Sequence, residues 1–358
     1  MKDFNIAIIG QGRSGRNIHG KYFKSDLNKR VRVVAVAEAD AERRERAKAE
    51  YEDCEVYENF RDMFSRTDID LIVNSTYSND HYAITKEIID AGFNVLVEKP
   101  MARTKYECDD LILAAKKKGV TLAVFQQSFF APFFEFVKEV VNSGKLGTIK
   151  QVDLTYSGFG RRWDWQTLQA RVAGSVYNTG PHPVGLGLYF LDFADDAHVA
   201  FSRLSRTELV SGDAEDYAKI ILTAKDKPVV DIEMISTDAY PATTIKLYGS
   251  RGCMKCTVGG EYDMKYVVPG ENPERPVIPT FIKDEEGMPT YCGEELKFHT
   301  ESGKIEGSPF DVAVDKMYET LYENIKNGAP LVVTPEMASK IIGIIEQTHA
   351  ANPLPVLY

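Results

Sequence analysis

A glycine-rich motif near the N-terminus constrains the fold of this chain more than any other feature. The apolar run Ile6–Ile9 leads directly into Gly10-Gln11-Gly12-Arg13-Ser14-Gly15, and the next residues are compatible with a helix. In such a unit the first glycine permits a tight turn, the second lets the backbone approach a pyrophosphate, and the third lets the helix pack closely on the strand. The helix N-terminus offers N–H groups and a positive dipole end to phosphates. We therefore expect all six residues of the motif to form a dinucleotide site.

An acidic residue follows the second apolar run and bears on the choice of cofactor. The run Val31–Ala37 ends at Glu38. An acid at this strand end accepts hydrogen bonds from the ribose hydroxyls and repels a 2′-phosphate, which favours NAD over NADP. The distance from the glycine motif exceeds the usual spacing of about 20 residues because the first helix and its loop are long. A solvated acid is the alternative, and Arg43 and Arg44 leave some room for NADP.

Strands continue to alternate with helices up to about residue 127. The later strands are predicted at Asp70–Asn74, Val95–Val97 and Thr121–Phe125. This alternation predicts a parallel, doubly wound sheet, hence an α/β Rossmann domain over residues 1–127. The polar loop after the first of these strands supplies three further candidates for cofactor contact, Thr76, Asn79 and His81. For His81, the role of a plain helix-start residue is favoured over a catalytic role.

Charged residues stand where another buried strand ends. Val95–Val97 runs into Glu98-Lys99-Pro100. Ligands of open α/β sheets bind at the carboxyl ends of the strands. Pro100 cannot continue a ladder and biases Lys99 toward an extended backbone. We expect Lys99 to be held at the sheet edge as a substrate and cofactor contact, with Glu98 beside it; two solvated turn residues are the alternative.

The pattern changes in the second half of the chain. Residues 149–157, the stretch around Ile232, and Ile245 with Leu247 alternate between apolar and polar side chains. Period-two alternation with one wet face is typical of an antiparallel sheet. We expect an α+β domain over residues 128–358, with an open, mostly antiparallel sheet. Residues 259–308 are predicted to be irregular, and two helices are predicted to close the chain.

Two polar clusters of the second half are candidates for substrate contact. The first, Arg162-Trp163-Asp164-Trp165, contains both tryptophans of the chain. Aromatic rings beside hydrogen-bonding charges suit a sugar, although a structural corner is an equal alternative. The second contains Tyr177, Asn178 and His182. If this segment is helical, Asn178 and His182 share a face. A histidine there can serve as a general acid or base near neutral pH.

Composition excludes several classes of function. The net charge of −10 gives no basic footprint for nucleic acid or an anionic membrane. No apolar stretch reaches the ~18 residues of a membrane span, and the N-terminus does not resemble a signal peptide. The five cysteines form no disulfide framework, and Cys253-x-x-Cys256 lacks a second pair, so no metal site is predicted. We expect a soluble, cytoplasmic protein.

Together these motifs resemble the Gfo/Idh/MocA oxidoreductase family over nearly the whole chain. The residues that carry the resemblance are Gly10-x-Gly12-x-x-Gly15, Asn79-x-His81, Glu98-Lys99-Pro100, Gly144-x-x-Gly147 and the segment from Gly174 to His182. The resemblance implies an active site between the two domains and hydride transfer between a nicotinamide and a hydroxyl-bearing carbon of a sugar or cyclitol. It also implies that Lys99 contacts the substrate hydroxyls, that His182 takes the proton, that the Lys99–Pro100 bond is cis, and that the chain forms a dimer or tetramer.

The chain departs from the family pattern at one position. Many relatives have an aspartate four residues before the histidine, where this chain has Asn178. An amide cannot raise the pKa of the imidazole by charge attraction. Either His182 works with Lys99 alone, or Tyr177 assists, or the substrate differs; Asn178 can also bond a substrate hydroxyl directly.

Three functions therefore stay open at the level of sequence. The first is an NAD-dependent dehydrogenase acting on a secondary alcohol of a sugar, cyclitol or glycoside. The second is an enzyme that retains NAD and cleaves or epimerises glycosides through transient oxidation at C3. The third is a regulator that senses a dinucleotide without turnover.

Overall fold

The N-terminal half folds into a parallel sheet. The computed structural model describes residues 3–240 and 244–358. The six strands of the sheet are β1 (Phe4–Ile9), β2 (Val31–Ala37), β3 (Glu55–Tyr57), β4 (Leu71–Asn74), β5 (Val95–Val97) and β6 (Leu122–Val124). Their order is β3-β2-β1-β4-β5-β6, and all neighbouring pairs are parallel. The order reverses between β1 and β4, so a ligand crevice is expected outside their carboxyl ends.

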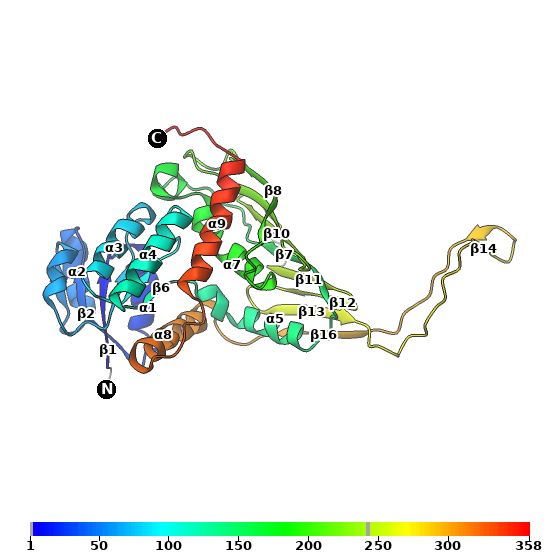
Figure 1. The fold of residues 1–358 in the computed structure, drawn as a ribbon, viewed down its shortest axis with the longest axis horizontal. Coiled ribbons are helices and arrows are strands. Elements are labelled where there is room, and N and C mark those ends of the chain that lie inside the picture. Colours follow the sequence, from blue (N-terminus) through cyan, green and yellow to red (C-terminus); the bar gives the residue numbers. More distant parts are fainter. Residues whose placement is uncertain (1–2, 241–243) are drawn as a thin grey trace.

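Helices cover both faces of this sheet, as Figure 1 shows. The connecting segments are a π-helical turn (Arg13–His19) that continues into α1 (Gly20–Phe23), α2 (Ala41–Glu50), 3₁₀ turns at Phe60–Ser65 and Ser78–Asp80, α3 (His81–Asp90) and α4 (Lys105–Lys118). These helices begin and end at residues that are typical of helix caps. Asp40 caps α2, and Thr104 and Glu107 form a capping box at α4. Gly119 ends α4 with a φ of 69°, a conformation that favours glycine.

The second half folds around a mixed, mostly antiparallel sheet, as predicted. Its strands are β7 (Ile149–Thr155), β8 (His198–Ser205), β9 (Tyr217–Thr223), β10 (Val229–Ile235), β11 (Ile245–Gly249), β12 (Gly252–Cys256), β13 (Glu261–Tyr266) and β16 (His299–Lys304). Their order is β16-β13-β12-β11-β7-β10-β9-β8, and β7 and β10 pair in parallel. Side chains such as Leu154 and Ile232 are buried on one face of the sheet, while Asp153 and Asp231 lie on the other face.

The helices of the second half cover one face of this sheet and reach back to the first domain. They are α5 (Pro132–Asn142), α6 (Ser175–Asn178), α7 (Pro181–Phe190), α8 (Pro309–Asn327) and α9 (Pro335–Ala351), with 3₁₀ turns at Gln127–Phe130, Trp165–Thr167 and Gln169–Arg171. Helix α9 packs against α4 and α7, and α8 packs beside α1 (Figure 1). The last strand of the first sheet ends at Val124 and the first strand of the second begins at Ile149, while α8 and α9 contact elements of the first sheet's half.

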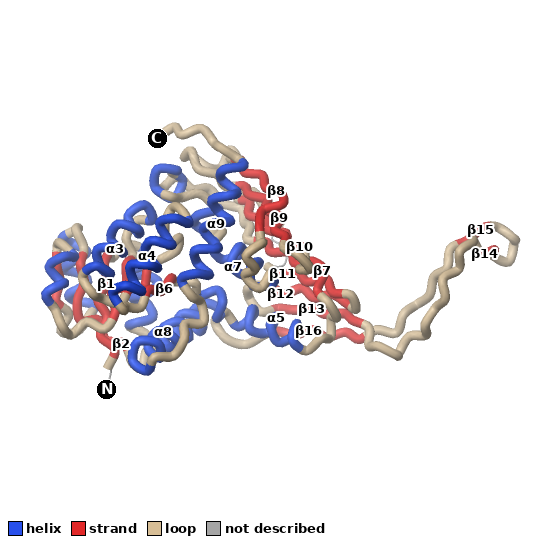
Figure 2. The backbone as a smooth tube through the Cα atoms, viewed as in Figure 1, coloured by secondary structure: helices blue, strands red, loops and turns tan. Residues whose placement is uncertain are grey.

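The predicted irregular excursion is only partly irregular. Residues 259–308 contain β13 and β16, which pair with each other at the edge of the sheet, so the prediction was wrong there. Between these two strands the chain leaves the body as a long hairpin, tipped by β14 (Ile282–Lys283) and β15 (Pro289–Thr290) (Figure 2). Within the described parts of the chain, no helix combines the length and apolar character that crossing a bilayer requires.

Candidate active site

The glycine motif forms a turn at the carboxyl end of β1. Gly10 has a φ of 92°, and a Cβ there would lie 2.7 Å from the Ser75 carbonyl oxygen. A Cβ on Gly15 would lie 1.9 Å from the Gly10 carbonyl oxygen, so only glycine lets the helix pack this closely. A Cβ on Gly12 would meet nothing within 4 Å. Gly12 therefore borders open space, which is the position where a pyrophosphate must approach the backbone.

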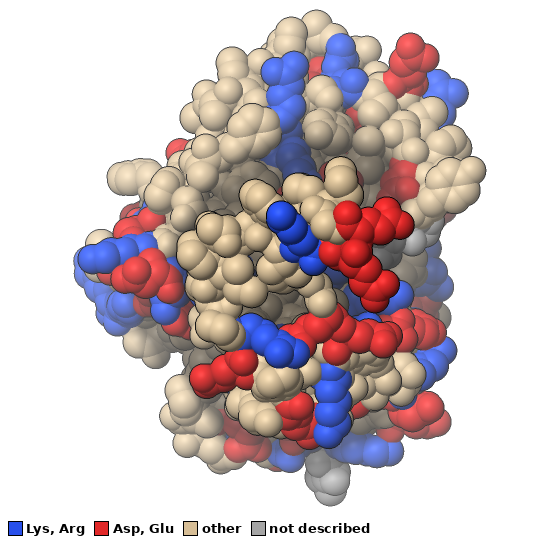
Figure 3. All heavy atoms as spheres, turned by 90° about the vertical axis from the view of Figure 1, so that its right-hand side faces the viewer, with Lys and Arg blue, Asp and Glu red and all other residues tan. Residues whose placement is uncertain are grey.

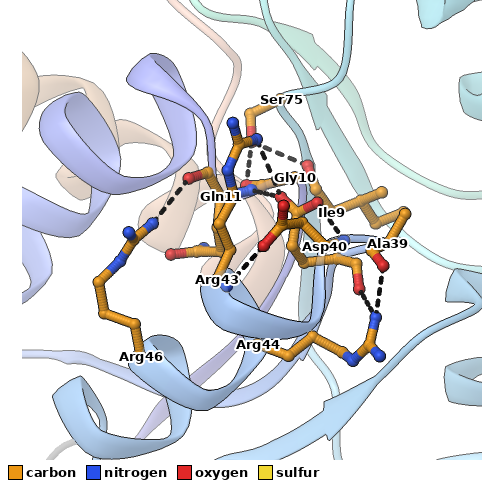
Figure 4. A network of polar contacts seen from close by, with 10 residues as sticks. Ile9, Gly10, Gln11, Ala39, Asp40, Arg43, Arg44, Arg46 and Ser75 are labelled. Carbon is orange, nitrogen blue, oxygen red and sulfur yellow. Dashed lines mark hydrogen bonds and ion pairs between the residues drawn. The ribbon is translucent and has the colours of Figure 1, made fainter.

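Glu38 joins the glycine turn to the end of β2. Its carboxylate accepts hydrogen bonds from the backbone N–H groups of Gln11 at 2.7 Å and Asp40 at 3.0 Å. Arg43 lies 3.8 Å from the same carboxylate, and Figure 4 shows how Arg43, Arg44 and Arg46 surround this turn. The carboxylate is thus fixed at the strand end, where the ribose of a dinucleotide is expected.

A cleft of about 530 Å³ lies over this turn and fits the expected cofactor. Six of the predicted cofactor residues line this cleft: Gly10, Gly12, Arg13, Ser14, Glu38 and Thr76. Sequence reasoning missed Ser75 and Tyr77, which also line it. Ser75 donates hydrogen bonds to the carbonyls of Ile9 and Gly10 and so ties β4 to the glycine turn. The open space at Gly12, the fixed Glu38 and the nearby Arg13 together match an adenine dinucleotide.

Two predicted cofactor residues lie behind the cleft. The His81 ring is buried, with Nδ1 at 2.6 Å from the Pro100 carbonyl oxygen and Nε2 at 3.3 Å from that of Thr76. Burial lowers the pKa of His81, and the single N–H of the neutral ring is placed on Nδ1, where it donates to the nearer carbonyl, that of Pro100. The Asn79 amide donates to Asp80 at 2.6 Å. The Lys99–Pro100 bond is cis, as the resemblance implied.

A buried polar chain runs from α8 to Glu98. Tyr318 Oη lies 2.7 Å from His19 Nδ1, and His19 Nε2 lies 3.1 Å from Glu98 Oε1. The other Glu98 oxygen accepts the backbone N–H of Lys99 at 3.2 Å. Burial alone would raise the pKa of Glu98, but the hydrogen bond from His19 and the nearby charge of Lys99 lower it to about 2. Glu98 is therefore an ionised, buried anchor beside Lys99.

Lys99 reaches across from the dinucleotide domain to the second domain. Its Nζ donates to the Asn178 backbone carbonyl at 2.7 Å. Burial lowers the pKa of Lys99; the Glu98 charge opposes this shift, and the guanidinium groups of Arg13 and Arg162 add to it. Lys99 thus joins the end of β5 to the segment at Asn178 in the second domain.

His182 begins a new helix. Helix α6 ends at Asn178 and α7 starts at Pro181, so Asn178 and His182 do not share one continuous helix. His182 Nδ1 lies 3.1 Å from Ser128 Oγ. Burial and the Lys99 charge lower the pKa of His182 to about 3, with Glu98 opposing weakly. Because Asn178 brings no charge, the imidazole stays neutral across the physiological range.

Tyr177 lies away from this group. Its hydroxyl donates to the Arg103 carbonyl at 2.8 Å, and its ring packs edge-on against His349 at 4.8 Å between centroids. Burial raises the pKa of Tyr177, so its hydroxyl stays protonated. The structure therefore gives Tyr177 a packing role and does not bring it to Lys99.

A polar cavity of about 370 Å³ adjoins the dinucleotide cleft. Gln166 lines both spaces, so they meet at this residue. Other polar residues of the cavity are Arg162, Asn178, Thr179, Glu215, Asp216 and Ser236. Sequence reasoning missed Gln166, Glu215 and Asp216, because chain order gives no sign that β9 and the tryptophan segment meet. The cavity offers hydroxyl, amide and carboxyl groups to a polar ligand.

Glu215 and His349 form a contact that is not an ion pair at neutral pH. Their closest atoms lie 3.8 Å apart. Burial raises the pKa of Glu215 to about 7, against the hydrogen bond from the Val176 backbone N–H, and burial lowers the pKa of His349 to about 4. Between these values both groups are neutral, so the pair contributes packing and no charge attraction.

The predicted tryptophan cluster is divided between the two spaces. Trp165 and Asp164 line the dinucleotide cleft, where Trp165 packs edge-on against Tyr77 at 5.0 Å between ring centroids. Asp164 caps the following turn through the Gln166 backbone N–H. Trp163 is 74% exposed. Of the four residues predicted to bind substrate in this segment, Arg162 is the one that lines the polar cavity.

The described residues contain no cluster of three or more histidine, cysteine or acidic residues that could hold a metal ion. Cys253 and Cys256 are both free thiols on β12, three residues apart. Successive side chains of a strand alternate between its faces, so residues at this spacing point to opposite sides. The cysteine pair is thus part of the sheet.

Sequence comparison identifies the family. A family profile described as "Oxidoreductase family, NAD-binding Rossmann fold" matches residues 4–126, and the "GFO/IDH/MocA C-terminal domain" profile matches residues 134–255. The chain belongs to the Gfo/Idh/MocA oxidoreductase family. Its cofactor is accordingly NAD, and the cleft at Gly12 and Glu38 is the site that fits it.

Individual relatives are distant. An uncharacterised oxidoreductase of Schizosaccharomyces pombe is 28% identical over 62% of this chain and 60% of that protein. The scyllo-inositol 2-dehydrogenase (NADP(+)) IolW of Bacillus subtilis is 25% identical over 95% of this chain and 91% of that protein. The structure of GenD2 from gentamicin A biosynthesis, in complex with NAD, is similar with a TM-score of 0.75 at 19% identity, over 98% of this chain and 94% of that one. The last likeness confirms the fold.

Proposed function

We propose that this oxidoreductase transfers a hydride reversibly between NAD and a secondary alcohol of a sugar, cyclitol or glycoside. One observation carries the proposal: the Lys99 ammonium is bonded to the backbone of Asn178, which lines the polar cavity, and this cavity shares Gln166 with the dinucleotide cleft. A hydroxyl-bearing carbon held in that cavity would face both the cofactor and a proton donor. The relatives named for scyllo-inositol and for gentamicin A biosynthesis support a substrate rich in hydroxyl groups.

NAD, when bound, supplies the hydride acceptor or donor, and the chain's own residues orient the alcohol and handle its proton. Lys99 has donors beyond the one bonded to Asn178, and its positive charge stabilises a developing alkoxide. Its lowered pKa also makes it a better proton carrier near neutral pH than an ordinary lysine.

His182 takes a different part from the one that the family resemblance implied. With a pKa of about 3 it is a weak base, since no carboxylate offsets its burial. In the tautomer whose Nδ1 donates to the Ser128 hydroxyl, the neutral imidazole presents a lone pair at Nε2. We assign it the role of accepting the hydrogen bond of the substrate hydroxyl and orienting it toward Lys99.

The test is NAD reduction over a panel of sugars, cyclitols and glycosides, followed by the Lys99→Met variant on the best substrate. We expect kcat/KM to fall about 10²- to 10⁴-fold, the usual contribution of charge stabilisation and proton transfer. Lys117→Met, an exposed change on α4, is the matched control and should keep wild-type activity. Ser128→Ala should mainly raise KM, because it loosens an orienting ring.

Three outcomes would contradict the proposal. A Lys99→Met enzyme with wild-type kcat/KM would remove Lys99 from the reaction. Conversion of a glycoside with the cofactor staying bound and no net NADH would indicate transient oxidation instead. Tight NAD binding, measured by calorimetry, without turnover on any member of the panel would indicate a dinucleotide sensor.

A further inference from the structure

Two adjacent arginines, Arg161 and Arg162, line the polar cavity, and neither has a close acidic partner. Within the described part of the chain, Arg161 forms no ion pair. Arg162 donates through Nη1 to the neutral amide of Gln166 at 2.5 Å, and its Nε lies 3.9 Å from the Asp164 carboxylate, at the limit of an ion pair. Most N–H donors of the two guanidinium groups are therefore free to bind a ligand.

The backbone that carries these arginines is fixed to the cavity wall. Gly160 donates to the Ser236 carbonyl, just beyond β10, at 3.0 Å, and Arg162 forms an isolated β-bridge with Val210. Ser236 and Val210 line the cavity themselves. The two arginine side chains thus start from a positioned segment, so less conformational freedom is lost when they bind a ligand.

The acids of the cavity do not neutralise these arginines. Asp216 accepts hydrogen bonds from the backbone N–H and the hydroxyl of Thr207 and from the Ser236 hydroxyl, and it forms no ion pair with any described residue. Burial raises the pKa of Glu215 to about 7, so this acid is neutral in slightly acidic solution. The cavity therefore sets two arginines against one aspartate and one acid that is neutral below this pH.

This local excess of positive charge runs against the composition of the chain. The chain has 53 Asp and Glu against 43 Lys and Arg, and on the face shown in Figure 3 basic side chains lie next to acidic ones. A further cation is close, because the Arg162 charge contributes to the lowered pKa of Lys99. Cations gathered without acids repel one another, and a bound anion would offset this repulsion.

We propose that the substrate is a sugar acid, whose carboxylate is bound by Arg161 and Arg162 while one of its hydroxyl groups is directed to Lys99. This inference rests on the proposed function and names the substrate class of the same site. A guanidinium matches the two oxygens of a carboxylate, and such charge-assisted hydrogen bonds are about twice as strong as neutral ones. The cavity volume of about 370 Å³ is that of a small-molecule site, and Leu209 and Val210 give it an apolar wall for the C–H face of a sugar.

A carboxylate fits this cavity better than a phosphate does. Phosphates are typically held by free backbone N–H groups at a helix N-terminus. Helix α6 begins at the cavity residue Ser175, but the Ser175 N–H donates to the Glu215 carbonyl, and the Val176 N–H donates to the Glu215 carboxyl group. These backbone donors are already in use, so the arginine side chains are left to recognise a planar anion of single charge.

NAD reduction with pairs of sugars that differ only at carbon 6 tests the proposal. The pairs are glucose with glucuronate and galactose with galacturonate, and glucose 6-phosphate is the phosphate arm. We expect kcat/KM for at least one acid to exceed that of its neutral partner by about 10- to 100-fold, the effect of hydrogen bonds to a charged group. Arg161→Gln/Arg162→Gln should abolish this preference, mainly by raising KM for the acid. Arg275→Gln is the matched control, because Arg275 pairs with Glu294 in the long hairpin; it should keep the preference.

Calorimetric titration of glucuronate and galacturonate into the NADH-saturated protein gives a readout that does not need turnover. The preferred acid should bind at least tenfold more weakly to the double variant than to the wild type and the Arg275→Gln control. Unchanged circular dichroism would show that the variants are folded. Neutral sugars that are oxidised as well as their acids, or a double variant that keeps the preference, would overturn the inference. Glucose 6-phosphate as the better substrate would also overturn it.

Failure of this inference differs from failure of the proposed function. If an acid binds in a manner that depends on the two arginines but does not reduce NAD, the carboxylate site stands and the hydride transfer is refuted. If neutral sugars reduce NAD and neither acid binds more tightly than they do, the hydride transfer stands and the carboxylate site is refuted.

Discussion

Single residues in the polar cavity carry charges that depend on pH, and Glu215 shows this most clearly. The residue is 3% exposed and its carboxyl accepts the Val176 backbone N–H, and no lysine or arginine among the described residues forms an ion pair with it. Burial therefore dominates and raises its pKa from 4.5 to about 7. An acid of this kind is protonated at the lower end of the physiological range and can donate a hydrogen bond to a ligand there.

Glu215→Gln should change how stability depends on pH. Because the folded-state pKa is raised, the contribution of the neutral carboxyl is fully present below about pH 4.5 and is lost as pH rises to 7. The variant cannot ionise, so it should match the wild type near pH 4 and exceed it by on the order of 3 kcal/mol at pH 8. Urea unfolding between these pH values measures the difference. The exposed Glu52→Gln control should show no such trend, and parallel curves for Glu215→Gln would contradict the assignment.

Sequence patterns predict the candidate site residues that depend on local chain order. The glycine motif, Glu38 and Lys99 each follow a buried strand, and the carboxyl ends of parallel strands meet at one edge of a sheet, so their convergence was predictable. The orientations of Tyr177 and Trp165 were not predictable from their neighbours in sequence. Tyr177 turns toward Arg103, and Trp165 turns toward Tyr77, because contacts between the two domains decide their orientation.

At the scale of elements, the turn after β1 contains two glycines that are needed for different reasons. Gly15 must be small because the helix packs on the strand, whereas Gly12 must be small because a ligand approaches. The same reasoning predicts different consequences for the same substitution at two positions three residues apart.

Gly15→Ala should destabilise the protein by about 1–3 kcal/mol, the usual effect of forcing atoms into a packed site. Gly12→Ala should leave the free energy of unfolding within about 0.5 kcal/mol of the wild type and weaken NAD binding at least tenfold. Chemical denaturation and calorimetric titration with NAD separate the two effects. Equal losses of stability in both variants, or full NAD affinity in Gly12→Ala, would refute this division.

Strands with a regular apolar pattern could be predicted from the sequence. A polar strand that is ordered only because it pairs with another strand could not. The strands β1, β2, β4 and β5 read as continuous apolar runs because both of their faces are covered. The sequence of β16, His-Thr-Glu-Ser-Gly-Lys, has no apolar alternation, since it lies at the sheet edge with most of its side chains exposed. It pairs with β13 across the long hairpin that separates the two strands, and nothing within such a polar segment shows this distant partner.

At the scale of the whole molecule, helix α8 near the end of the chain contacts residues that lie beside Lys99 in the first domain. Tyr318 on α8 contacts His19 beside the glycine turn, and His19 contacts Glu98, the neighbour of Lys99. The ionised Glu98 needs a donor, so His19 Nε2 carries a proton and Nδ1 accepts from the Tyr318 hydroxyl. Three segments far apart in sequence thus set the charge next to Lys99.

Tyr318→Phe should therefore act on Lys99 without touching it. The change leaves His19 Nδ1 buried without a donor, which costs about 1–3 kcal/mol of stability. Without that bond the His19 ring is free to turn away from Glu98, whose carboxylate then attracts the Lys99 ammonium more strongly, so the pKa of Lys99 should rise. The pH dependence of amine modification at Lys99 measures this directly. Tyr322→Phe, on the same helix but bonded to Asp3 at the surface, is the control. If stability falls while the Lys99 titration is unchanged, the chain from Tyr318 to Glu98 is structural and does not tune the lysine.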